Sequence, residues 1–378
     1  MHSKKRLGAA AAAAFLLVQQ QRFLLAAAFG GDVLPTAQQL RQSIKLMTYN
    51  IHAWRDAEHK CNFDRIVRVV QQVHPDILFL NEVLHPFARP HSTEECSPAV
   101  IEQYYQLVKE GKGRDNPIDS IFLPCDENLT FLHRLAEETN LPNIEFNGAT
   151  DNSFFGKGTF FGNAILTSLP IVDWVHVPLE VEEGDLELGN QKRDFVDPRA
   201  FSAAKVLVDV ADNNLQQKQL NIGMTFGHLD HKSEELREKQ ILRGIQKTQS
   251  LLESVSHIVC GDFNTFQRSD CTDPGWQAIL DLYQSRGWPL PCERSLVLDA
   301  LVDMGYKDTF YDALGEGKEE SLKKPLPTSW TNRPLMRIDH IFAKHIPGGI
   351  QIVPKWHYRV ETDASDHFPV VLEADLAV

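Results

Sequence analysis

The sequence predicts one layered α/β or α+β domain that follows a short N-terminal targeting segment. Of its 378 residues, 43% are hydrophobic and 24% are charged, a composition typical of globular proteins. After residue 43, strand-like apolar runs alternate with helical stretches, and polar clusters follow several of the apolar runs. Because these clusters are spread from residue 50 to residue 367, we expect one domain to bring them together.

Each element is predicted from its periodicity. Residues 44–51 roughly alternate apolar and polar side chains, which is typical of a half-buried strand. Phe63, Ile66, Val67 and Val70 fall at helical spacing, so we expect a helix over 62–73. Two stretches without clear periodicity, near 84–127 and 266–334, are interpreted as insertions. The same criteria predict an amphipathic helix at 234–252 and strands at 76–83, 165–168, 201–210, 220–226, from 258, 338–343, 350–356 and 368–374.

The first 43 residues have the composition of a targeting presequence. Lys4, Lys5 and Arg6 precede an apolar run at 8–18, and a second run follows at 23–29. Each run is shorter than the roughly 20 residues that span a bilayer. The pattern is typical of a secretory signal and equally of a mitochondrial or plastid transit peptide. We therefore expect 1–43 to be removed and 44–378 to fold without a membrane span; a disordered or membrane-tethering tail is the alternative.

The remaining chain is strongly acidic. Residues 1–43 hold five basic residues and one acidic residue, so the net charge of −13 leaves about −17 for residues 44–378. Proteins that bind long nucleic acids usually present a net basic surface. The acidic balance therefore disfavours a non-specific nuclease, although a local basic groove or a bound metal can still accommodate a polyanion.

Cysteine use leaves the redox compartment open. Cys260 lies in an apolar strand pattern and is expected to be a small buried hydrophobe. Cys271 and Cys292 belong to one insertion and can pair in an oxidising compartment. A loose group in the first insertion lacks the spacing of a zinc site and is interpreted as ordinary loop composition: His85, His91 and Cys96.

Six polar clusters stand at the ends of the apolar runs, where layered α/β folds place their functional sites. Carboxylate and amide oxygens recur in them, and Mg²⁺ accepts such ligands together with water and substrate phosphate. The clusters are Thr48-Tyr49-Asn50, Asn81-Glu82-Val83, Gly227-His228-Leu229-Asp230-His231, Gly261-Asp262-Phe263-Asn264, Arg337-Ile338-Asp339-His340 and Ser365-Asp366-His367-Phe368-Pro369.

The six clusters, in this order, resemble those of the endonuclease/exonuclease/phosphatase (DNase I-like) superfamily over about residues 44–375. The resemblance implies a four-layer α/β/β/α sandwich and a phosphoesterase that uses Mg²⁺, with Mn²⁺ as a substitute. It implies that Glu82 is a direct metal ligand and that Asn50 and Asp366 complete the oxygen shell. Arg199, together with Asn50, would then lie against the substrate phosphate.

The resemblance also implies an in-line attack of water on phosphorus. Asp262 would accept the proton of that water, and Asn264 would hydrogen-bond the water or a phosphoryl oxygen. His367 with Asp339 resembles a His–carboxylate pair that stabilises negative charge in the transition state. Whether His367 is instead the base stays open. His228 would face the leaving oxygen as a hydrogen-bond donor or general acid.

Three functions from different classes fit these features. The first is a phosphatase or phosphodiesterase acting on a small or lipid-derived phosphoester, and the second is a nuclease acting on DNA or RNA. The third is a non-catalytic adaptor of the same fold, which the presence of Glu82 and His367 disfavours. Residues 327–333 partly resemble the tryptophan-centred segment of inositol-polyphosphate phosphatases, but Asn332 stands where that family usually has Asp. The oligomeric state stays open.

Other polar and aromatic residues near the clusters have simpler interpretations. Asp230 is expected to support neighbouring loops, and Tyr49 and Trp54 are expected in the core rather than in a substrate groove. His231 and His340 are expected only to pack or to face solvent. The acidic residues expected at the solvated surface are Asp303, Asp308, Glu180, Glu182, Glu183 and Asp185.

Overall fold

A computed structural model of the chain describes residues 42–58, 60–85, 130–151, 160–179, 182, 185, 199–211, 216–231, 233–315 and 324–378. All of these residues belong to one unit, Arg41–Val378. The expected presequence, apart from its last two residues, lies outside the described residues. So does most of the first expected insertion, with His91 and Cys96. Both interpretations therefore stay predictions.

Two mixed sheets of six strands form the centre of this unit. In the first sheet β1 runs parallel to β2, and in the second β7 runs parallel to β8; the other neighbouring strands are antiparallel. The first sheet has the order β11 (Gln351–Arg359), β12 (Val370–Ala377), β1 (Gln42–Asn50), β2 (Ile77–His85), β4 (Phe160–Thr167), β3 (Asn143–Asp151). The second has the order β5 (Ile171–Leu179), β6 (Arg199–Ala211), β7 (Gln217–His228), β8 (His257–Asp262), β10 (Asp339–Lys344), β9 (Lys307–Asp308).

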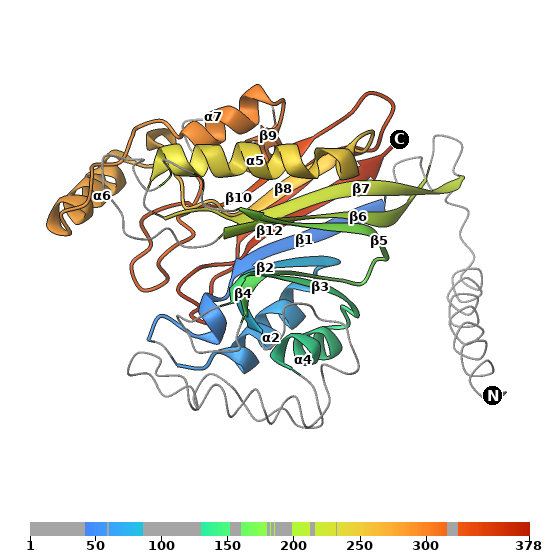
Figure 1. Ribbon diagram of the computed structural model, residues 1–378, viewed down its shortest axis with the longest axis horizontal. Helices are drawn as coiled ribbons and strands as arrows, with labels where there is room; N and C mark the ends of the chain where they lie inside the picture. Colours follow the sequence, from blue (N-terminus) through green and yellow to red (C-terminus); the bar gives the residue numbers. More distant parts are fainter. Residues whose placement is uncertain are drawn as a thin grey trace, which may run out of the picture. The chain divides into compact units, whose positions relative to one another are not determined.

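Helices cover the outer face of each sheet (Figure 1). Helices α2 (Phe63–Val73) and α4 (Phe131–Thr139) share an apolar cluster with the first sheet, and α5 (Glu234–Leu252) and α7 (Leu296–Asp303) share one with the second. The inner faces of the two sheets pack on each other, with the ring centroids of Phe79 and Phe226 4.6 Å apart. The architecture is therefore the expected α/β/β/α sandwich of four layers.

Strand β1 is buried on both faces, not on one face as its alternation predicts. Ile44 and Leu46 contribute to the cluster between the two sheets, whereas Met47 and Tyr49 contribute to the cluster under α2 and α4. Alternate side chains of β1 therefore point into two different apolar layers. A central strand of a four-layer fold has no face exposed to solvent. Tyr49 and Trp54 lie in the core, as expected.

The structure contains every helix and strand expected from periodicity, and α5 has the predicted bounds. The sequence interpretation missed α4, β3 and β5, and it missed three helices in the second insertion: α6 (Asp273–Ser285), α7 and α8 (Thr309–Leu314). Helices this short are stabilised mainly by tertiary packing, which periodicity does not report. The capping side chains of Thr272, Ser295 and Asp308 were the available signal, since each accepts a hydrogen bond from the first turn of its helix.

Two acidic residues expected at the solvated surface are instead ion-paired in the interior. Asp185 is 1% exposed and accepts hydrogen bonds from Lys239 and Arg243. Asp308 pairs with the buried guanidinium of Arg337. The local sequence around each carboxylate is polar and therefore does not predict that the carboxylate is buried. Its burial depends on an ion-pair partner that is distant in the sequence.

The remaining expectations for these residue types have mixed outcomes. Asp303 is exposed as expected, and Glu182 pairs with Arg243, whereas Glu180 and Glu183 lie outside the described residues. Cys260 is buried as predicted. Cys271 and Cys292 are both free thiols, so the pairing considered for the second insertion is not formed.

Arg337 holds the second insertion to the second sheet. Its Nη1 lies 2.7 Å from Asp308 Oδ2 and 3.3 Å from Asp270 Oδ2, and its Nη2 lies 2.8 Å from Asp308 Oδ1. The Arg337 side chain is 3% exposed, so both carboxylates depend on it for charge compensation. Arg337 also keeps the pKa of Asp308 below its usual value, despite the opposing effect of burial.

We predict that Arg337→Met lowers the free energy of unfolding by about 3–5 kcal/mol, because it leaves two carboxylates without their buried partner. Urea unfolding followed by circular dichroism measures the change. Arg294→Met is the matched control, since the side chain of Arg294 is 82% exposed and pairs only at the surface with Asp299. Equal stability of the two variants would contradict a structural role for Arg337.

Candidate active site

The ends of four strands bring the polar clusters together. In the second sheet, His228 of β7 and Asp339 of β10 are both register partners of Asp262, the last residue of β8. In the first sheet, Asn50 at the end of β1 pairs in register with Asn81 of β2. Because parallel neighbours end at the same edge, the two sheets present their polar residues at one place.

Asn81 joins the two sheets at that place. Its amide Nδ2 donates to Gly227 O at 3.0 Å and to Asn163 Oδ1 at 2.9 Å, and its Oδ1 accepts from Asp262 N at 3.1 Å. The side chain is fully buried, so each of these hydrogen bonds replaces one to water. The sequence interpretation included Asn81 in a cluster but gave it no role. An amide in the middle of an apolar run was the signal for it.

Gly261 lets β7 and β8 approach each other beside the site. Its φ of 136° lies in a region that side chains rarely adopt. A Cβ at this position would lie 2.1 Å from Gly227 O. Only glycine therefore fits immediately before Asp262.

A β-bulge turns Glu82 into the site. The β2–β4 register shifts between Leu80 and Val83, and Glu82 in the gap has a φ of 56°. Its Oε1 lies 3.7 Å from His228 Nε2, and its side chain is 22% exposed. The local backbone conformation is thus unusual at a residue expected to bind metal.

Asp262 is the centre of the cluster. Asn50 Nδ2 donates to its Oδ2 at 2.9 Å, and Asn264 N donates to its Oδ1 at 3.0 Å. The same Oδ2 lies 3.4 Å from His228 Nε2 and 3.9 Å from His367 Nε2. Burial raises the pKa of Asp262 to about 7, although the charge of His367 acts in the opposite direction. Asn264 itself has a φ of 50° and donates through Nδ2 to Leu229 O at 3.0 Å.

His367 and Asp339 form a His–carboxylate pair, with 2.9 Å between His367 Nδ1 and Asp339 Oδ2. Burial opposes the charged imidazole, but the carboxylates of Asp339 and Asp262 raise the pKa of His367 well above its usual value. Thr328 Oγ1 accepts a hydrogen bond from Asp339 N at 3.0 Å. The pair therefore fixes which imidazole nitrogen faces Asp262.

Arg199 lies behind His228. Its Nη1 is 3.0 Å from His228 Nδ1 and its Nη2 is 3.4 Å from His231 Nδ1. Since a guanidinium only donates, Nδ1 of His228 must accept, and the neutral ring carries its proton on Nε2. Burial and Arg199 lower the pKa of His228 well below its usual value, which favours this neutral form. Arg199 is 7% exposed, and the phosphate contact expected for it stays a proposal.

The donor set fits a hard divalent cation. Ligand atoms of Glu82, His228 and Asp262 lie within 4.8 Å of one another, and so do those of Asp262, Asp339 and His367. Asp339 Oδ1 is buried without a hydrogen-bond partner among the described residues, so a carboxylate oxygen remains to be satisfied. Each group combines two carboxylates with one imidazole, and the carboxylate oxygens are ligands that a cation such as Mg²⁺ accepts.

Asp366 and Asn50 have further contacts at the margin of the cluster. Asp366 Oδ1 lies 3.7 Å from His52 Nδ1, and Thr331 N donates to Asp366 O at 2.9 Å. Asn50 Oδ1 accepts from His52 N at 2.9 Å and keeps a second lone pair. Asp366 does not belong to either close group of carboxylates and imidazoles found within the described ranges.

Residues given simpler interpretations take structural positions. Asp230 Oδ1 accepts from Ser233 N at 2.9 Å and so supports the start of α5. His340 is buried with Nε2 2.9 Å from Thr265 O, whereas His231 is exposed. His85 is buried against Phe146, with 4.8 Å between ring centroids.

The Endonuclease/Exonuclease/phosphatase family model matches residues 47–367, which is most of the chain. The chain belongs to this family. Solved family structures from Beutenbergia cavernae, Leptotrichia buccalis and Bacteroides vulgatus share 19%, 16% and 16% of their residues with it. They align over 89%, 88% and 89% of this chain and 72%, 99% and 99% of their own, with TM-scores of 0.51, 0.51 and 0.50. At these identities the solved structures support the shared fold. No curated protein matches significantly.

Membership places this endonuclease/exonuclease/phosphatase protein among hydrolases of phosphoesters, which generally use divalent metal ions. Candidate carboxylate and imidazole ligand groups are present at the strand ends. Within the described part of the chain, no helix is long and apolar enough to cross a bilayer.

We predict that Gly261→Ala lowers the free energy of unfolding by about 2–5 kcal/mol, through backbone strain and overlap with Gly227 O. Gly287→Ala is the matched control, because Gly287 also has a positive φ, 63°, but no atom lies within 4 Å of the added Cβ. Gly287→Ala should lower the free energy of unfolding by only about 1–2 kcal/mol. Chemical unfolding of both variants separates the effect of overlap with Gly227 O from the effect of backbone strain. An equal loss of unfolding free energy in the two variants would rule out the close approach of β7 and β8 as the cause.

Proposed function

We propose that this family member hydrolyses a small or lipid-derived phosphoester, a monoester or a diester, by in-line attack of water with Mg²⁺ as cofactor. The observation that carries the proposal is the contact between Asp262 and the surrounding Asn50, His228 and His367 at the joined ends of the two sheets. An adaptor without catalysis would not need three buried ionisable groups in mutual contact, because their burial opposes folding.

Glu82, Asn50 and Asp366 are proposed to hold the cation. When bound, Mg²⁺ would offset the charge of the phosphate, and Mn²⁺ would serve in its place. Arg199 is proposed to add positive charge on the His228 side. Its contact with His228 supports a second effect, which is to keep the Nε2 proton of His228 available to an oxygen.

The attacking water is proposed to transfer its proton to Asp262, with Asn264 orienting that water or a phosphoryl oxygen. His367 is assigned to charge stabilisation rather than to the role of base, because its Nδ1 is held by Asp339 and its Nε2 points toward a second carboxylate. His228 is proposed to donate a hydrogen bond from its Nε2–H to the leaving oxygen and so to stabilise the negative charge that develops there. The neutral ring keeps this proton, and the leaving oxygen takes its proton from solvent water.

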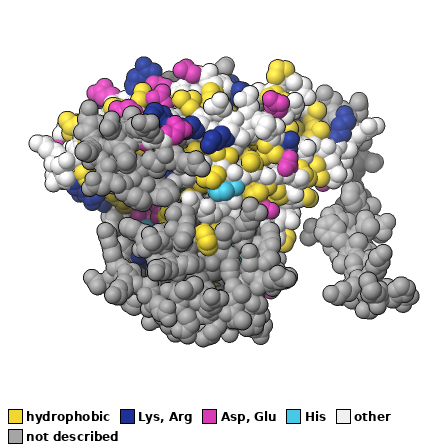
Figure 2. Space-filling model, in the orientation of Figure 1, with side chains coloured by type: hydrophobic (Ala, Val, Ile, Leu, Met, Phe, Trp, Pro, Cys, Tyr) yellow, Lys and Arg dark blue, Asp and Glu magenta, His cyan; other side chains and the backbone are white. Residues whose placement is uncertain are grey.

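A small substrate is preferred over a long nucleic acid because of charge. The chain carries a net charge of −13. On the face in Figure 2, basic and acidic side chains of the described residues are interspersed instead of forming a continuous basic stripe. Long polyanions gain most of their affinity from many cation–phosphate contacts, which such a surface supplies poorly. A nuclease remains the second candidate, favoured by the family itself.

Glu82→Gln and His367→Ala are each expected to lower kcat/KM by about 10²–10³-fold or more while the fold is retained, since each removes a group that acts on the reacting phosphate. Turnover of bis-p-nitrophenyl phosphate measures activity, and circular dichroism measures folding. Glu253→Gln, at the exposed end of α5, is the control and should keep full activity. Full activity in either Glu82→Gln or His367→Ala would contradict the assignment of these residues to the active site.

We expect chelation by EDTA to abolish turnover and Mg²⁺ to restore it, with Mn²⁺ able to substitute. A panel of bis-p-nitrophenyl phosphate, inositol phosphates, sphingomyelin, DNA and RNA then identifies the substrate class. Turnover confined to small or lipid phosphoesters supports the proposal. Turnover of nucleic acid alone would replace it with the nuclease, and metal-independent turnover would remove the cation from the mechanism.

A further inference from the structure

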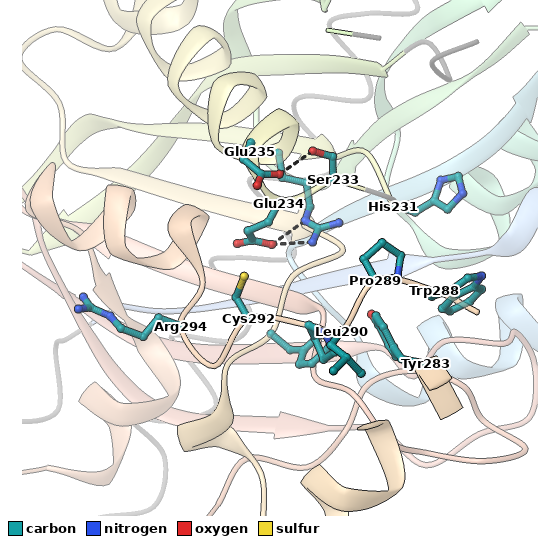
Figure 3. Close-up of a pocket in the computed structure, with 13 residues that line it drawn as sticks. His231, Ser233, Glu234, Glu235, Tyr283, Trp288, Pro289, Leu290, Cys292 and Arg294 are labelled. Atoms are coloured by element: carbon teal, nitrogen blue, oxygen red, sulfur yellow. Dashed lines mark hydrogen bonds and ion pairs between the residues drawn. The ribbon is translucent and has the colours of Figure 1, made fainter. Parts of the chain in front are cut away.

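A pocket of about 350 Å³ lies between the start of α5 and the second insertion. Phe266, Tyr283 and Trp288 supply aromatic rings, and Pro289 and Leu290 add apolar surface. Figure 3 shows Trp288, Pro289 and Tyr283 gathered on one side, with Ser233, Glu234 and Glu235 at the start of α5 on the other. The lining therefore combines an aromatic and apolar side with a polar side, and concave sites of this size are typical of small-molecule binding.

One wall of the pocket lies close to His228, the proposed hydrogen-bond donor to the leaving oxygen. His231 lines the pocket, and its Nδ1 is 3.4 Å from Arg199 Nη2. The other terminal nitrogen of Arg199 is 3.0 Å from His228 Nδ1. A single arginine therefore separates the pocket wall from the side chain proposed to donate a hydrogen bond to the leaving oxygen.

A second wall extends toward Asp366. Arg286 Cζ lies 4.7 Å from the ring centroid of Trp288 and 5.0 Å from that of Trp330, so the three side chains stack. Thr331, next to Trp330, donates its N–H to Asp366 O at 2.9 Å. Two separate series of contacts therefore connect the pocket to the catalytic cluster. One runs through Arg199 to His228, and the other runs through Trp330 and Thr331 to Asp366.

The charged groups of the pocket wall are nearly all compensated. Arg237 Nε donates to Glu234 Oε2 at 2.9 Å, and Arg294 pairs with Asp299 at 2.8 Å. Glu235 accepts a hydrogen bond from the hydroxyl of Ser233, and no ion pair with a cationic side chain is found for it within the described residues. A second phosphate group would meet a carboxylate there, whereas a neutral ring would meet aromatic faces and polar atoms at its edge.

We propose that this pocket binds a flat, neutral, aromatic ring of nucleobase size that is carried by the leaving group of the substrate. The inference rests on the proposed function, because it uses the assignment of His228 to the leaving oxygen. It names the substrate class as a phosphoester of a small aromatic or nucleoside-like alcohol. A ring that carries several phosphate groups does not belong to this substrate class. Trp288 is the main stacking surface, with Tyr283 and Phe266 beside it.

Two probes that differ only in the ring test this inference: adenosine 5′-monophosphate and ribose 5-phosphate, or the methyl ester of each if the enzyme cleaves only diesters. Their leaving oxygens are alike, so the ratio of their kcat/KM values reports the ring. We expect the adenosine ester to be preferred by about 10-fold or more, the order of one base–aromatic stack. Trp288→Ala should remove most of this preference, so that the ratio of the two kcat/KM values falls toward 1.

Trp356→Ala is the matched control, since Trp356 is also exposed, 67% against 40% for Trp288, but lies on β11 and does not line the pocket. It should keep the preference. Equal kcat/KM for the two probes in the parent protein, or an equal loss for both in Trp288→Ala, would overturn the pocket. A hexyl phosphate turned over as well as the adenosine ester would overturn its selectivity for a ring.

Binding of adenosine alone, followed by saturation-transfer NMR, separates this inference from the proposed function. If no phosphoester is hydrolysed but adenosine binds the parent protein and not Trp288→Ala, the pocket stands and the proposed function fails. If phosphoesters are hydrolysed but adenosine binds neither protein, the proposed function stands and the pocket fails.

Discussion

The hydrogen bonds of the Asn81 side chain are the constraint on which the site depends. One amide meets Gly227 O and Asn163 Oδ1 through its nitrogen and Asp262 N through its oxygen, at 3.0, 2.9 and 3.1 Å. These contacts connect β2 of the first sheet to β7 and β8 of the second. Since all of the groups are buried, the loss of one partner would leave a polar atom unsatisfied, at a cost of about 1–3 kcal/mol each. The sheets are therefore held at one spacing where their polar residues meet.

That fixed spacing makes the electrostatics of the cluster specific. Asp262 receives hydrogen bonds from Asn50 of the first sheet and from the backbone of Asn264, and it faces imidazoles of both His228 and His367. Glu82 reaches the same region only because a bulge gives its backbone a positive φ. Burial raises the pKa of Asp262, and the charge of His367 acts against that rise; a bound cation would act in the same direction as His367. The arrangement therefore favours the binding of a cation. It also favours a ligand that carries both positive and negative charge, such as a complex of a phosphate with a metal ion.

The second insertion serves the site in two ways. Its interior is tied to the sheet through Arg337, Asp308 and Asp270, so the segment that follows is held firmly. That segment supplies Thr328, which accepts a hydrogen bond from the backbone of Asp339, and Thr331, which contacts Asp366. The outer part of the insertion carries α6 and supplies Tyr283 and Trp288 to the aromatic pocket, whose other side is the start of α5. A stretch that interrupts the periodic pattern of the chain thus contributes both to stability and to the pocket for which a ring-binding role is proposed.

The sequence by itself determined the layered class, most of the strands, both helices with strong periodicity and the residues of the polar clusters. These follow from local patterns, because side-chain period and strand-end polarity are properties of neighbouring residues. Tertiary structure decided the rest. It made β1 buried on two faces, turned Asp185 and Asp308 into interior ion pairs, assigned Asn81 to the join between the sheets and placed Arg199 behind His228. Each of these depends on a partner far away in the chain, and burial and hydrogen bonding act between such partners only after the layers have packed.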